Sequence, residues 1–196
     1  MAVVKLSTAG LTNYAKYSSM LAGNAPFVAG AYDLLETTTL TSSASSVTFS
    51  GLGSYSDYAH LQIRMVIRGG SSDNFSYTLN GDTSSIYALH RIRGNGSSVA
   101  AYASTSASSA GGYEMPTSGY VSGAFGAIVM DILDFSSTSK NTTVRGLYGH
   151  AADGNRVGLV SNLYASTDAI TSFTTDGGGG GFGSGCRFSL YGIKGA

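Results

Sequence analysis

The stretch AHLQIRMVIR, residues 59–68, decides how this sequence folds. Apolar and polar side chains alternate along it. The apolar ones are Leu61, Ile63, Met65 and Ile67, and the polar ones are His60, Gln62, Arg64 and Arg68. Only an extended strand sorts these residues onto opposite faces, because successive side chains of a strand point in opposite directions. The apolar face must pack against a second layer, so the stretch predicts one strand of a layered β-protein.

Similar segments recur on both sides of this strand, bounded by Gly, Ser, Asn or Asp. NFSYTLNGD (74–82) ends at Asn80-Gly81, a strong hairpin-turn signal, and SSIYALHRIRGNG (84–96) ends at a second Asn-Gly pair. Further strands are predicted over 31–40, 46–50, 125–135, 142–150, 156–164, 169–175 and 186–194. About ten short strands with regular turn signals are typical of a single all-β sandwich or barrel.

Two segments lack the alternation. Residues 1–30 are predicted to form an arm outside the sandwich domain of residues 31–196, with one short helix over 11–23. An arm of this size packs on a neighbour when it is ordered. Its predicted contacts are Leu11, Tyr14, Tyr17 and Phe27. Residues 101–124 are predicted to form a long irregular loop, which in a compact domain usually marks a functional or interface loop.

Charged residues make up 11% of the chain, against about 25% in an average protein, and the net charge is zero. The sequence contains no cationic run, so we expect neither a nucleic-acid partner nor an anionic membrane surface. No apolar run approaches the roughly 20 residues that span a bilayer, and we expect a soluble protein made in a cytoplasm. A polar but uncharged surface is tolerated best where partners in an assembly cover it.

Three runs carry a resemblance to a known family: SSASSVTFSGLGSYSDYAHLQIRMVIRG (42–69), YTLNGDTSSIYALHRIRGNG (77–96) and GCRFSLYGIKGA (185–196). Together they resemble small virion structural proteins of tailed bacteriophages, especially marine and cyanobacterial ones. The resemblance covers roughly residues 30–196. The opening KLSTAGLTNYAKYSSMLAGNAPF (5–27) is similar to the attachment arm of such proteins.

The resemblance implies an antiparallel jelly-roll-like β-sandwich that acts in a multimer. It implies a non-enzymatic decoration or cement protein that docks on the capsid exterior through its arm and stabilises the particle. The alternative is a tail fibre or tail-tip protein whose sandwich binds carbohydrate. The implied partners are further copies of the chain, as a homotrimer, with the major capsid protein or tail proteins, and host surface glycans in the alternative. The chain would be synthesised in the host cytoplasm and reside in the virion.

Residue spacing argues against the common catalytic and phosphate-binding motifs. GGGGGFGSG (177–185) satisfies a phosphate-loop pattern, but a strand and not a helix follows it. No G-x-S-x-G nucleophile elbow occurs. Asp57 precedes His60 by three residues, a spacing that forms no orienting hydrogen bond across a turn into a strand. We therefore expect no catalytic residue and no cofactor.

Metal binding is also not expected. Asp131 and Asp134 lie three residues apart, on opposite faces of a strand. HAADGN (150–155) is better interpreted as a turn than as a calcium loop, since it lacks the repeated acidic spacing of such loops. Cys186 is the only cysteine and is predicted to be a small buried hydrophobe.

Tyrosines in loops keep the sugar-binding alternative open, since exposed aromatic rings serve both sugar binding and subunit contacts. The predicted exposed loop aromatics are Tyr55, Tyr58, Tyr102, Tyr113 and Tyr120.

The glycine tract is predicted to join two strands of the same sandwich, as a close-packed contact loop where other backbones crowd against it. Its predicted assembly contacts are Gly177, Gly178, Gly179, Gly180, Gly181 and Phe182. A bulky residue in place of Gly179 should then weaken assembly and leave an isolated subunit folded.

Overall fold

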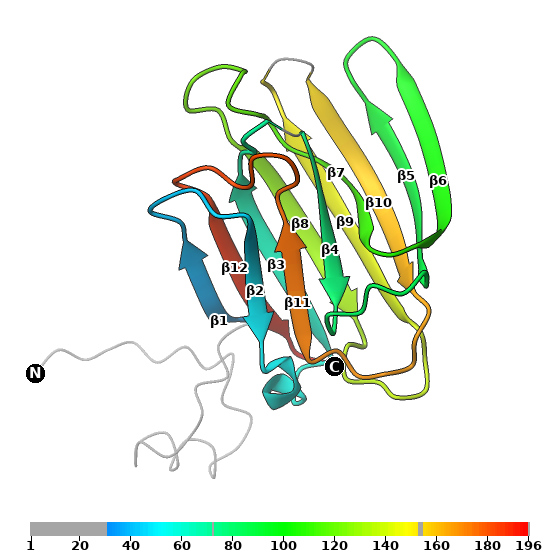
Figure 1. The fold of residues 1–196 in the computed structure, drawn as a ribbon. Coiled ribbons are helices and arrows are strands. Elements are labelled where there is room, and N and C mark those ends of the chain that lie inside the picture. Colours follow the sequence, from blue (N-terminus) through cyan, green and yellow to red (C-terminus); the bar gives the residue numbers. More distant parts are fainter. Residues whose placement is uncertain (1–30, 72, 153–154, 196) are drawn as a thin grey trace, which may run out of the picture. The chain divides into compact units, whose positions relative to one another are not determined.

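The computed structural model describes residues 31–71, 73–152 and 155–195. These residues form twelve strands and one short 3-10 helix, η2 (Leu52–Tyr55), and the strands build two antiparallel sheets packed as a sandwich (Figure 1). The all-β antiparallel sandwich predicted from the sequence is therefore confirmed. The predicted arm and short helix, with Leu11, Tyr14, Tyr17 and Phe27, lie outside the described residues.

The larger sheet has eight strands in the order β1-β12-β3-β8-β9-β10-β5-β6. Their bounds, in that order, are Tyr32–Thr39, Arg187–Ile193, His60–Ile67, Gly126–Leu133, Thr142–His150, Arg156–Tyr164, Tyr87–Gly94 and Val99–Ala107. The smaller sheet has the order β2-β11-β4-β7. Its strands are Ser46–Ser50, Ser172–Asp176, Asn74–Leu79 and Ala110–Glu114.

Eight of the twelve strands have the connectivity of a jelly roll, in which two four-stranded sheets are linked by crossings between them. These sheets are β1-β12-β3-β8 and β2-β11-β4-β7. The other four strands are two antiparallel hairpins, β5–β6 inserted between β4 and β7, and β9–β10 inserted between β8 and β11. Together these hairpins continue the larger sheet past β8 as β9-β10-β5-β6, and we call them the extension (Figure 1).

The core lies between the two sheets and follows the alternation seen in β3. The buried residues of that strand include Leu61, Ile63, Met65 and Ile67. Aromatic rings belong to the same buried cluster. Phe182 contacts Phe188 with ring centroids 5.0 Å apart, and Tyr77 stacks on Phe173 with centroids 5.1 Å apart. Large rings bury much apolar area per residue, which stabilises a sandwich built from short strands.

The long loop predicted over residues 101–124 is wrong. This segment contains most of β6 and the whole of β7, and only residues 115–125 form an irregular connection. Strand β6 consists of Ala, Ser and Thr with one Val and one Tyr, and its residues are exposed on both faces. A strand with no buried face has no reason to alternate, so periodicity could not reveal it.

Asn80-Gly81 forms a turn but does not close a hairpin. Both residues have positive φ, 56° and 67°, as the pair favours. Strand β4 before the turn belongs to the smaller sheet, whereas β5 after it belongs to the larger one. The Tyr87 hydroxyl holds this crossing, since it accepts from the Leu79 N–H at 3.0 Å and donates to the Asp82 carbonyl at 3.0 Å.

Candidate interaction surface

Large apolar side chains lie exposed on the outer face of the larger sheet, mainly on the extension. Strand register places Val129, Leu147, Leu159 and Ile92 opposite one another on the neighbouring strands β8, β9, β10 and β5. Val66, Val157 and Val99 stand in the next row of the same face. All seven are between 38% and 74% exposed, and we call them the outer patch.

Small residues separate the large ones in the second row. Gly149 and Gly94 face Val157 from its two neighbouring strands, and Gly94 in turn pairs with Val99. The outer patch therefore alternates raised and hollow positions. Such a surface is suited to interdigitation with another sheet face.

Polar residues that satisfy one another border the outer patch. The Gln62 Nε2 donates to Asp131 at 2.7 Å, and the Arg64 Nε donates to the side-chain Oε1 of Gln62 at 2.6 Å. The Arg145 Nε donates to the second oxygen of Asp131 at 3.3 Å. This border is already paired within the chain, as is common for the rim of an interaction surface.

Behind the outer patch, Glu114 connects the jelly roll to the extension. Glu114 ends β7 and is 2% exposed. One carboxylate oxygen lies 3.0 Å from the Arg91 Nη1 and also pairs with Arg93, while the other lies 2.9 Å from the Arg156 Nε. Arg91 and Arg93 belong to β5 and Arg156 to β10, so one anion from the smaller sheet holds three cations from the extension.

Tyr148 and His150 of β9 lie in the electrostatic field of this cluster. Among the described residues, neither ring nitrogen of His150 nor the Tyr148 hydroxyl has a hydrogen-bond partner, although all three atoms are buried. Burial, followed by the positive charge of Arg156, lowers the pKa of His150, and Glu114 and Asp73 oppose this only in part. The neutral imidazole is therefore the form that the folded chain favours.

This shift predicts an acid-sensitive contribution from His150. Because its pKa is lower in the folded chain than the usual 6.5, the unfolded chain binds more protons as the pH falls through that value, and stability declines. We expect the free energy of unfolding to drop between pH 7.5 and about pH 5.5, in the range below the ordinary histidine pKa, and to drop less in His150→Gln. Urea titrations at both pH values measure this, and equal slopes in the two proteins would contradict it.

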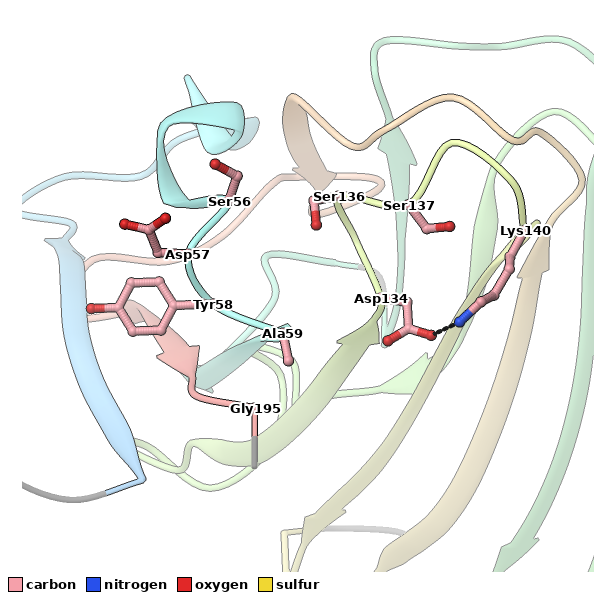
Figure 2. A pocket seen from close by; sticks show the side chains of 9 residues that line it. All are labelled: Ser56, Asp57, Tyr58, Ala59, Asp134, Ser136, Ser137, Lys140 and Gly195. Carbon is pink, nitrogen blue, oxygen red and sulfur yellow. Dashed lines mark hydrogen bonds and ion pairs between the residues drawn. The ribbon is translucent and has the colours of Figure 1, made fainter.

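A polar depression of about 360 Å³ lies at one end of the sandwich, lined by Ser56, Asp57, Tyr58, Ala59, Asp134, Ser136, Ser137, Lys140 and Gly195 (Figure 2). The ion pair with Lys140 is the main reason that the pKa of Asp134 is lowered. His60 adjoins this site, and its Nδ1 accepts a hydrogen bond from the Asp134 backbone N–H at 2.9 Å. The neutral ring thus carries its proton on Nε2, the reverse of the tautomer that a catalytic triad requires.

The glycine tract joins β11 of the smaller sheet to β12 of the larger one, which confirms that it links two strands of one sandwich. Its crowding comes from the same chain. The Gly181 carbonyl accepts from the Gly70 N–H at 2.8 Å, and the Gly179 carbonyl accepts from the Ser71 N–H at 3.0 Å. A Cβ on Gly181 would lie 2.4 Å from the Ala44 carbonyl oxygen. Packing within the subunit therefore explains Gly177, Gly180 and Gly181, where an added Cβ would lie less than 3.0 Å from backbone atoms.

The predicted assembly contacts in this tract divide into two groups. Phe182 is fully buried among core aromatic rings, and Gly177 and Gly181 are buried as well, so these three residues are not surface contacts. Gly178, Gly179 and Gly180 form the exposed tip. An assembly role for the tip, including the expected effect of a bulky residue at position 179, stays a prediction.

The predicted exposed aromatics do not form one surface. Tyr113 is a core residue of β7 and is fully buried, so its prediction as an exposed loop residue is wrong. Tyr102 is exposed but lies in β6, with the Arg91 guanidinium over its ring. Tyr55 and Tyr58 pack against the core as partly buried residues, and Tyr120 is half-buried. The error at Tyr113 follows from treating 101–124 as a loop.

Cys186 is fully buried, as predicted. Burial raises the pKa of its thiol, which keeps the reactive thiolate scarce. We expect the native protein to resist alkylation by iodoacetamide at pH 8 over an hour and the urea-unfolded protein to react fully. Intact mass measures the difference, and rapid native labelling would contradict the buried placement.

Two other kinds of feature are absent from the described ranges. No group of three or more His, Cys, Asp or Glu side chains in them is arranged to hold a metal ion. No helix in the described part of the chain is long and apolar enough to cross a membrane.

Comparison of the sequence with protein-family models gives no match, and comparison with curated proteins gives no significant relative.

Proposed function

We propose that this chain is a non-enzymatic structural protein of a tailed-bacteriophage virion, a decoration or cement protein on the capsid exterior. Residues 1–30 dock on the major capsid protein, and the sandwich associates with further copies of itself to stabilise the particle. The resemblance of the sequence to small virion proteins supplies the biological setting.

The observation that carries the proposal is the outer patch on a jelly-roll scaffold. Single exposed apolar residues are ordinary on a protein surface, but a contiguous patch marks an interaction surface. Here the patch residues stand directly opposite one another on adjacent strands. A chain with few charges and an open apolar sheet face is suited to work inside an assembly.

The polar features of the structure also fit a structural role. Glu114 is occupied by three arginines, and Asp134 by Lys140. These carboxylates serve ion pairs that hold strands and loops together. Since these charged groups are engaged within the chain, we assign partner binding to the outer patch.

Cryo-electron microscopy of purified particles that contain the chain tests the proposal. We expect density for the sandwich at regular positions on the outside of the capsid, and particles made without the chain should release their genome at a lower temperature. Density on the tail would instead support the tail-fibre or tail-tip alternative. Absence of the chain from purified particles would overturn the proposed function.

A further inference from the structure

We infer that the outer patch is covered by the outer patch of a second copy of this chain, with the two larger sheets packed face to face about a two-fold axis. The inference deepens the self-association in the proposed function and rests on that function for its biological setting. Its physical basis is the area, the relief and the charge of the patch.

The exposed area is appropriate for a subunit interface. Seven residues that are 38–74% exposed present on the order of 600 Å² of surface, at the top of the 300–600 Å² range typical of the largest patch on a monomer. This area approaches the 800 Å² or so that each partner contributes to an interface of standard size. A second copy that buries the patch would therefore satisfy what a stable dimer requires.

The relief of the patch is compatible with self-pairing. An isologous contact brings the same surface together from both subunits, so it must carry raised and hollow positions at once. Val157 between Gly149 and Gly94, with Val99 beyond Gly94, meets that condition. Two antiparallel sheets pack with their inner faces about 10 Å apart, and side chains of this size interdigitate at that spacing.

Charge does not oppose the contact. The chain has a formal net charge of zero, so two copies approach without net repulsion. The bordering residues Arg64, Asp131 and Arg145 are hydrogen-bonded within each chain and sit beside the patch and not in its centre. The centre of the patch holds apolar side chains, so a contact there strands no unpaired charge. Arg187, which pairs in register with Val66, lies at the edge of the patch.

The inner face of β9, β10 and β5 within the extension is already occupied. Strand β7 packs over β10, β5 and β9, and Glu114 fixes it there. The outer face of these strands is therefore the one left for a partner. A face that meets itself generates pairs, so we infer two copies in place of the three expected from the sequence.

Sedimentation equilibrium of the full chain over a range of concentrations tests the inference. We expect the wild type to sediment as two chains. Leu159→Lys, at the centre of the patch, and Leu147→Lys, each tested alone, should raise the dissociation constant at least tenfold, because each places like charges across the two-fold axis. Val121→Lys is the matched control, since Val121 is 67% exposed and lies in the 115–125 connection. It should leave the dimer unchanged.

Circular dichroism and urea midpoints check that the variants fold. We expect values close to those of the wild type, because Leu147 and Leu159 are half exposed and contribute little to the core. A wild type that is a single chain at every concentration, a complex of three chains, or patch variants with wild-type mass would each overturn the inference. A monomer whose binding to particles is lost in Leu159→Lys would assign the patch to a particle protein and keep the proposed function. A dimer that is absent from particles would overturn the proposed function and keep the inference.

Discussion

Replacing Glu114 with Gln is expected to lower the free energy of unfolding by about 3 kcal/mol, the lower end of the range for breaking a buried ion pair. The substitution removes the carboxylate charge that pairs with Arg91, Arg93 and Arg156. The three like charges then repel one another in a site that water reaches poorly. The loss stays at the lower end because Arg93 and Arg156 retain partly exposed side chains.

Urea denaturation measures this loss, with Glu36→Gln on the exposed face of β1 as the matched control. The control should change stability by less than about 0.5 kcal/mol. Hydrogen exchange supplies a regional readout, because in Glu114→Gln protection should fall first in β5, β6 and β10 and last in β12 and β3. Uniform loss across the sheet, or a loss under about 1 kcal/mol, the worth of an exposed pair, would show that Glu114 does not anchor the extension.

Replacing Gly181 with Ala is expected to destabilise the protein by about 2–4 kcal/mol, the sum of left-handed backbone strain and overpacking. Gly181 has φ 64°, and an added Cβ would lie 2.4 Å from a backbone oxygen that cannot move aside without displacing the 43–45 segment. Thermal and urea unfolding of the purified variant measure the effect.

Gly179→Ala provides the comparison within the same tract. An added Cβ there meets only the Ser71 hydroxyl, at 3.2 Å. That hydroxyl donates to the Gly179 carbonyl at 2.8 Å, but it is exposed, so it can shift and bond to water instead. Gly179 is also exposed, so its replacement should change the free energy of unfolding by less than about 0.5 kcal/mol. Equal losses at the two positions would mean that the tract acts through chain entropy and not through the contact with Ala44.

Much of the fold could be predicted because a strand with one buried face alternates apolar and polar residues along the sequence. In β2 and β8 buried positions alternate with exposed or half-buried ones, and the alternation located both strands. Strand β6 could not be found in this way, because neither of its faces is buried. The crossing after Asn80-Gly81 was missed because a turn pair specifies local φ and ψ angles and says nothing about which sheet receives the next strand.

The candidate surface was less accessible to sequence reasoning. Glu114 lies in a segment predicted to be a loop, and its partners come from two distant strands, so no spacing connects them. The outer patch did leave a signal, since RVGLVSNLY (156–164) has apolar residues on both of its faces. Val157 and Leu159 point to one face of the sheet and Val160 to the other, which indicates a strand that packs against a partner on each of its faces. Phe182, placed among glycines, gave no sign that it belongs to the core.

Because β5–β6 and β9–β10 are insertions, the strands that build the jelly roll are distinct from the strands that carry most of the outer patch. Each hairpin leaves the jelly roll after one of its strands and returns to the next, so the eight-stranded scaffold closes through its own pairings. Outward side chains of β9 and β10 can consequently change without disturbing the strand pairings of the scaffold. Related chains built on the same scaffold would then differ in whom they bind and agree in how they fold.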